Sequence, residues 1–137
     1  MTEEKNKTVK IYRKQVPPNP IKRSFSQTLK AVEAQVEWQA LPRDKQLKGK
    51  ELCMIIAEVL RLHPEALIRV DGEDREAAEV AEIYSMLNYS HIEAVIDSIA
   101  ATKYRIRAMK TYLRTSLYNV VFTLENSMDN EVRSDLI

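Results

Sequence analysis

Apolar residues recur at helical spacing along most of the chain, and polar or proline-containing stretches separate the periodic segments. Residues three and four positions apart share one face of a helix, so each segment predicts a helix with one apolar face. The expected helices cover residues of about 26–41, 45–62, 75–87, 91–101 and 103–124. The pattern therefore predicts an all-α fold of about five helices in a compact bundle.

The last of these helices has the most regular apolar pattern. Its apolar positions follow at steps of three, four, four, three and four residues, at Ile106, Met109, Leu113, Leu117, Val120 and Leu124. This spacing gives a narrow stripe along a helix, and we expect the stripe to pack into the core.

Side chains that can accept a hydrogen bond from the first helical amides precede most of these helices. The candidate caps are Ser24 or Ser26, Asp44, Asp74 and Thr102. In the fourth helix, Ser90 and Glu93 have the spacing of a capping box, in which each side chain bonds the other residue's backbone N–H. The sequence thus predicts Ser90 as the cap of that helix.

One segment has the character of a strand. Residues 67–70 alternate and are rich in β-branched side chains, and Asp71-Gly72 follows them as a turn signal. We expect a short extended segment here, without an obvious partner strand.

The chain has 137 residues, which is the length of one domain. Residues 1–22 are basic and contain three prolines that block regular structure, so we expect a disordered arm there. Residues 23–124 should form the helical module, and the polar residues 125–137 should form a tail.

The net charge of +1 conceals a strong segmentation of charge. Residues 31–102 carry seven Lys and Arg against fourteen Asp and Glu, a net charge of −7. Residues 103–124 carry five basic residues and no acidic one, and residues 1–30 carry eight basic against two acidic residues. This distribution indicates either pairing within the molecule or one surface directed at an anionic partner.

Composition disfavours secreted and membrane proteins. Cys53 is the only cysteine and lies in an apolar run, so we expect a buried thiol and no internal disulfide. No stretch reaches the roughly 20 apolar residues of a membrane span, and the polar N-terminus is unlike a secretory signal. We therefore expect a cytoplasmic protein with no membrane contact.

Catalytic chemistry has no visible basis in the sequence. His63 and His91 have no cysteine, histidine or carboxylate at metal-ligand spacing. Two glycines cannot build a phosphate-binding loop. We therefore expect no enzyme activity, no catalytic residue, no bound metal and no cofactor.

A basic stripe is the clearest candidate for binding. A helix over 103–124 would place four cations on one face, spaced by four, three and four residues: Lys103, Arg107, Lys110 and Arg114. They are accompanied by Tyr104, Tyr112 and Tyr118. Such a surface fits nucleic-acid phosphates or an acidic protein, and tyrosines can stack on bases. The alternative is a solvated face, or pairing with the third helix through Glu73, Glu76, Glu79 and Glu82.

A longer motif occupies the C-terminal half. It reads Leu87-Asn88-Tyr89-Ser90-His91-Ile92-Glu93-Ala94-Val95-Ile96-Asp97, then Ile106-Arg107-Ala108-Met109-Lys110-Thr111-Tyr112-Leu113, then Leu117-Tyr118-Asn119. These segments resemble the C-terminal domain of unknown function of replication initiator A proteins from plasmids and integrative elements of Gram-positive bacteria. The resemblance implies a helical module like the C-terminal domains of DnaD-type primosomal proteins, which help to recruit host replication machinery.

The chain departs from this family at several positions. Ala108 stands where the family has Asn, and Val120-Val121 where it has Ala-Pro, so we expect the last helix to run longer than in relatives. Ser127-Met128 and Ser134 replace a Tyr pair and a His of the family. The family's N-terminal winged helix, which binds the origin, has no recognisable counterpart before the resemblance begins.

Together, the stripe and the resemblance predict a non-enzymatic, replication-associated module of a plasmid or integrative mobile element. The module would bind DNA, a host replication protein, or both. The residues expected to bind are Lys103, Tyr104, Arg107, Lys110, Arg114, Tyr118 and Asn119. The alternative is a small structural or regulatory interaction module with no nucleic-acid role.

Overall fold

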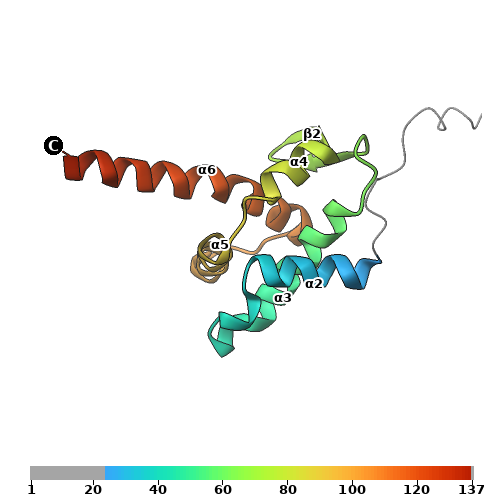
Figure 1. Cartoon of the computed structure of the whole chain (residues 1–137), viewed down its shortest axis with the longest axis horizontal. Helices are drawn as coiled ribbons and strands as arrows, with labels where there is room; N and C mark the ends of the chain where they lie inside the picture. The colour runs from blue at the N-terminus through green and yellow to red at the C-terminus, as the bar shows by residue number, and fades with distance from the viewer. Residues whose placement is uncertain (1–23, 137) are drawn as a thin grey trace, which may run out of the picture.

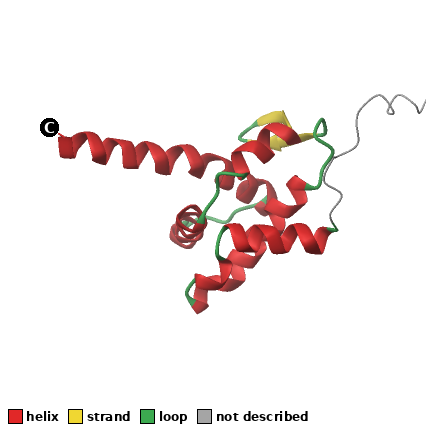
Figure 2. Cartoon of the chain, in the orientation of Figure 1, coloured by secondary structure: helices red, strands yellow, loops and turns green. Residues whose placement is uncertain are grey.

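The computed structural model describes residues 24–136, with side chains up to residue 124. The elements in chain order are α2 (Phe25–Gln35), the 3₁₀ helix η1 (Trp38–Ala40), α3 (Arg43–Leu60), β1 (Leu67–Val70), β2 (Glu73–Glu76), α4 (Ala77–Tyr84), α5 (Tyr89–Ala101) and α6 (Met109–Leu136). Within these residues, five α-helices and one small hairpin confirm the predicted, essentially all-α fold (Figure 2). The expected arm at residues 1–22 lies outside the described residues.

Helix α3 forms the centre of the core, because its C-terminal half has a broad buried apolar face. Leu52, Cys53 and Ile56 are completely buried, and α3 packs against α2, α4, α5 and α6. Burying each large apolar side chain contributes about 1.5–3 kcal/mol. Gly49 lets this helix approach its neighbours closely, because a Cβ there would collide with the Leu41 side chain.

Helix α6 confirms part of the predicted apolar stripe. Leu113 and Leu117 are completely buried, and the helix packs against α5, α4 and α3. The predicted end at residue 124 is wrong, since the helix runs to Leu136 through a segment that contains neither glycine nor proline. Figure 1 shows α6 extending well beyond the other described elements.

Strand β1 does have a partner, contrary to the sequence prediction. It pairs with β2 in an antiparallel register that places Leu67 opposite Glu76 and Val70 opposite Glu73. The turn is Asp71-Gly72, whose φ angles of 56° and 79° are the positive values that a tight two-residue hairpin turn requires. Because β2 takes residues 73–76, the predicted helix start at 75 and the Asp74 cap are wrong, and α4 begins at Ala77.

The caps of the first two long helices show one correct and one wrong prediction. Ser24 caps α2 through a capping box with Gln27, in which the Gln27 N–H donates to Ser24 Oγ at 3.1 Å. Asp44 lies inside the first turn of α3, and the cap position is Pro42, which makes no side-chain hydrogen bond. An acidic residue in a first turn still interacts favourably with the helix dipole.

Helix α5 is capped by Asn88 rather than by Ser90. The His91 N–H donates to Asn88 Oδ1 at 3.2 Å, and the Asn88 N–H donates to His91 Nδ1 at 3.0 Å. Glu93, expected to complete a box with Ser90, instead forms an ion pair with Lys45 of α3 at 3.1 Å. The helix therefore begins one residue before Ser90, at Tyr89.

Candidate nucleic-acid interface

The predicted basic helix is interrupted between α5 and α6. Helix α5 ends at Ala101 and α6 begins at Met109, so Lys103 and Arg107 lie in an irregular connection. Thr102 ends α5 instead of beginning α6, because its N–H donates to Ile99 O at 3.1 Å and its hydroxyl donates to Ser98 O at 2.9 Å. The four predicted cations therefore do not form one helical stripe. In Figure 2 this connection runs from α5, which is seen end-on, back to the body of the molecule.

The connection and the first turn of α6 nevertheless bring several cations to the surface. Lys103, Arg105 and Arg107 are exposed, and none of them forms a salt bridge with a described residue. Lys110 forms an ion pair with Glu58 at 3.1 Å, yet its side chain remains 58% exposed. Tyr104 lies among these residues and is 69% exposed. We refer to the five residues Lys103, Tyr104, Arg105, Arg107 and Lys110 as the cationic connection.

Arg105 was not among the predicted binding residues. A continuous helix over 103–124 would have placed it on a different face from Lys103 and Arg107. The irregular connection removes that constraint, so all three residues belong to the same short exposed segment. The count of five basic and no acidic residues over 103–124 was the sequence signal that could have included Arg105.

Helix α6 also begins within this segment. The first backbone N–H groups of a helix have no acceptor in their own helix, and the helix dipole adds partial positive charge at that end. The first helical hydrogen bond here runs from the Tyr112 N–H to Ala108 O at 2.9 Å. The N-terminal end of α6 therefore adds to the positive potential of the cationic connection.

Arg114 is placed differently from the other predicted cations. It is half-buried, and its Nε atom is buried without a hydrogen-bond partner among the described residues. Its backbone oxygen accepts a hydrogen bond from the Tyr84 hydroxyl at 2.7 Å. Burial raises the pKa of Tyr84, and the Arg114 charge opposes this shift. Arg114 thus belongs to the contact between α4 and α6.

Tyr118 and Asn119 attach the hairpin to α6. Tyr118 is 8% exposed, and the Arg75 guanidinium lies 4.9 Å from the centre of its ring. Asn119 Nδ2 donates to Asp71 Oδ1 at 3.2 Å, and the Asp71 N–H donates to Thr115 Oγ1 at 2.8 Å. These contacts hold the Asp71-Gly72 turn against the helix. The structure does not bring Tyr118 and Asn119 into the cationic connection.

Two of the four carboxylates expected to neutralise the stripe, Glu73 and Glu79, pair instead with an arginine of the hairpin. Arg75 of β2 forms ion pairs with Glu79 at 3.1 Å and with Glu73 at 3.4 Å. Of the four cations predicted to form the stripe, Lys110 forms an ion pair with a described residue, Glu58 of α3. Within the described residues, no carboxylate of β2 or α4 forms an ion pair with the cationic connection.

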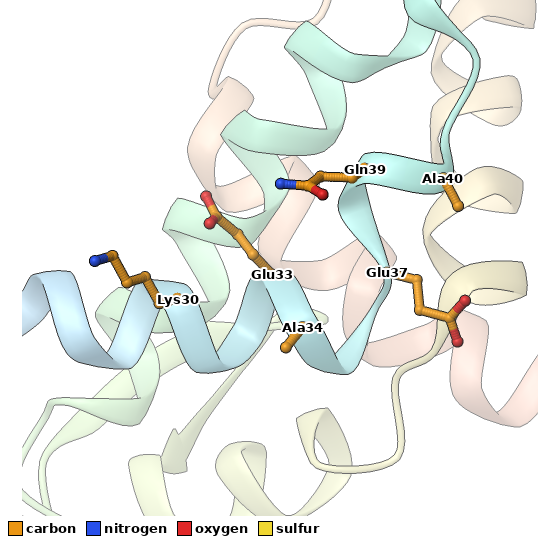
Figure 3. A pocket seen from close by; sticks show the side chains of 6 residues that line it. All are labelled: Lys30, Glu33, Ala34, Glu37, Gln39 and Ala40. Carbon is orange, nitrogen blue, oxygen red and sulfur yellow. The ribbon is translucent and has the colours of Figure 1, made fainter.

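A hollow of about 580 Å³ lies between the end of α2 and η1 (Figure 3). Its lining residues are Lys30, Glu33, Ala34, Glu37, Gln39 and Ala40. In Figure 3 the side chains of Glu33 and Gln39 point toward one another, whereas the Glu37 carboxylate points away from them. Glu33 is already engaged in an ion pair with Lys50 of α3 at 2.6 Å. The charged residues of this lining, Lys30, Glu33 and Glu37, are of both signs and form no cluster of one charge.

Three further observations on the described residues concern metal binding, membrane spans and the single cysteine. Among them, no group of three His, Cys, Asp or Glu side chains is arranged to hold a metal ion. No helix in that part of the chain is both long enough and apolar enough to cross a membrane. The thiol of Cys53 is completely buried as predicted, and desolvation raises its pKa to about 12.

Comparison with known proteins identifies one family. The sequence pattern of a family described only as a family of unknown function, DUF6017, matches residues 22–137. No curated protein and no solved structure matches the chain. Because the match covers well over half of its length, the chain belongs to the family of unknown function DUF6017.

Proposed function

We propose that this chain is a non-enzymatic, replication-associated module of a plasmid or integrative mobile element that binds DNA through the cationic connection. The observation that carries the proposal is the exposure of Lys103, Arg105 and Arg107, which form no salt bridge with a described residue. The replication context is supported by the resemblance of the C-terminal half to replication initiator A proteins.

The physical basis of the proposed binding is the release of counterions. A cation that neutralises a DNA phosphate displaces a condensed counterion, so affinity falls as the salt concentration rises. Four cations in contact with duplex DNA give a slope of about −3.6 for log affinity against log salt. Phosphate contacts of this kind carry no sequence information, so the binding should be independent of base sequence.

A charge-reversal pair tests this proposal. Lys103→Glu with Arg107→Glu should abolish binding of labelled DNA at low salt, measured by fluorescence anisotropy. Both residues are exposed and outside the helices, so the melting temperature should remain close to that of the parent. A smaller salt slope in each single variant, by about 0.9 on duplex DNA, would identify the lost contact as a phosphate contact.

Lys30→Glu with Arg43→Glu provides the matched control. Lys30 lies on α2 and Arg43 at the start of α3, and both are exposed without a salt bridge to a described residue. The control pair alters net charge as much as the test pair but leaves the cationic connection intact. Equal loss of binding in both pairs would show that net charge alone matters. No binding by the parent at low salt would refute the DNA proposal and leave recruitment of a host replication protein as the role to test.

A further inference from the structure

Among the described residues, Tyr104 is the aromatic residue with the largest exposed fraction. Its exposed fraction is 69%, compared with 44% for Phe122. Burying a large apolar side chain stabilises a fold by about 1.5–3 kcal/mol. Because the Tyr104 side chain is mostly exposed, it contributes little of this energy to folding. The ring therefore presents a free π-surface beside exposed cations.

We infer that Tyr104 is a stacking platform for a base of single-stranded DNA, and that Lys103, Arg105 and Arg107 neutralise the flanking phosphates. This inference rests on the proposed function and names the class of nucleic acid that the same site prefers. In a duplex, both faces of each base are covered by neighbouring base pairs. In a single strand the faces are accessible, and proteins bind such strands by combining a basic track with aromatic side chains.

The local geometry fits this combination. Lys103 and Arg105 are the direct neighbours of Tyr104, with Cα atoms about 3.8 Å apart along the chain. Residues 102–108 have no regular secondary structure, so the ring and its flanking cations are not separated by the fixed rotation of a helix. A base that stacks on Tyr104 would thus carry its own phosphates into the range of the two neighbouring charges.

The expected energetic signature separates stacking from charge. Removing an aromatic platform weakens binding of single-stranded DNA by about 5- to 150-fold, the range that corresponds to one stacked base. Removing a cation lowers the salt slope by about 0.7 on a single strand. Tyr104→Ala should therefore reduce affinity without changing the salt slope, because no charge is removed.

The experiment compares one labelled strand of about 12 nucleotides, free and annealed to its complement, within the size range that one single-strand-binding module covers. The proteins are the full-length chain, Tyr104→Ala, Tyr104→Phe and Phe122→Ala. The Phe substitution at 104 keeps the ring. Phe122 is an exposed aromatic control on α6, about 20 Å along the helix from its first residue. Melting curves confirm that each variant is folded.

The inference predicts tighter binding of the single strand than of the duplex by the parent. Tyr104→Ala should lose most of that preference, whereas Tyr104→Phe and Phe122→Ala should retain it. Salt-dependent binding of both probes with equal affinity, unaffected by Tyr104→Ala, would overturn the inference and leave the proposed DNA binding intact. Absence of salt-dependent binding to either probe would refute the proposed function itself, and the inference with it.

Discussion

Replacing Asn88 by alanine should destabilise the protein by about 0.5–2 kcal/mol, the usual cost of losing a side-chain cap. The Asn88 side chain accepts the His91 N–H at 3.2 Å, and alanine cannot replace this bond. The reciprocal bond from the Asn88 N–H to His91 Nδ1 uses backbone atoms of residue 88 and can persist. The expected loss is therefore near the middle of the range, about 1 kcal/mol, or about 4 °C in melting temperature for a chain of this size.

Thermal and urea unfolding of Asn88→Ala, Asn88→Asp and Ser90→Ala test this reasoning. Asp retains an acceptor at the cap, so Asn88→Asp should be nearly neutral. Ser90 is exposed in the first turn of α5 and makes no hydrogen bond through its side chain among the described residues, so Ser90→Ala should change stability by less than about 0.5 kcal/mol. A larger loss for Ser90→Ala than for Asn88→Ala would show that the helix begins where the sequence pattern predicted.

Two further predictions concern the core. Leu113→Ala and Leu117→Ala should each cost about 2–5 kcal/mol in urea unfolding, because both side chains are completely buried, whereas unchanged melting of both variants would contradict the packing of α6. Cys53 should resist alkylation by iodoacetamide at neutral pH until the protein unfolds, because its thiol is buried and its pKa is raised to about 12. Rapid labelling of the native protein, followed by mass spectrometry, would refute that burial.

The helical character of the chain could be predicted from sequence because apolar spacing reports directly on which residues face a core. This worked for α3 and for Leu113 and Leu117 of α6. It failed at residues 102–108, where neither glycine nor proline marks a break and the apolar spacing continues through Ile106. The end of α5 at Ala101 agrees with the prediction, whereas α6 begins at Met109 instead of 103. The hydrogen bonds of Thr102 fold it onto the end of α5, and periodicity does not detect such local contacts.

The cap of α5 illustrates a choice between two plausible local signals. Asn88 and Ser90 are both residue types that commonly cap helices. The burial of the apolar residues around the cap favours Asn88. With Asn88 as the cap, Leu87 and Ile92 occupy the two positions of a hydrophobic staple, and both are buried. The second strand was missed for a related reason, since all four residues of β2 are charged and its pairing depends on the Asp71-Gly72 turn.

The predicted binding residues divide according to what packs on them. Lys103, Tyr104, Arg107 and Lys110 are exposed, as a binding role requires. Arg114, Tyr118 and Asn119 face the α4 and hairpin side of α6, where they make contacts within the fold. Sequence spacing along one helix could not distinguish these groups, because the distinction depends on contacts with residues 30 and 48 positions away.

Residues 103–107 of the cationic connection lie outside the helices, and this has a consequence for the kinetics of binding. Helical hydrogen bonds fix the backbone of a helix before a ligand binds, whereas residues 103–107 lack such bonds. Each residue whose backbone a ligand orders costs about 1–2 kcal/mol of conformational entropy. A single module should therefore dissociate quickly from its ligand. Long residence would require several copies on one strand, or tethering to another protein that supplies a high local concentration.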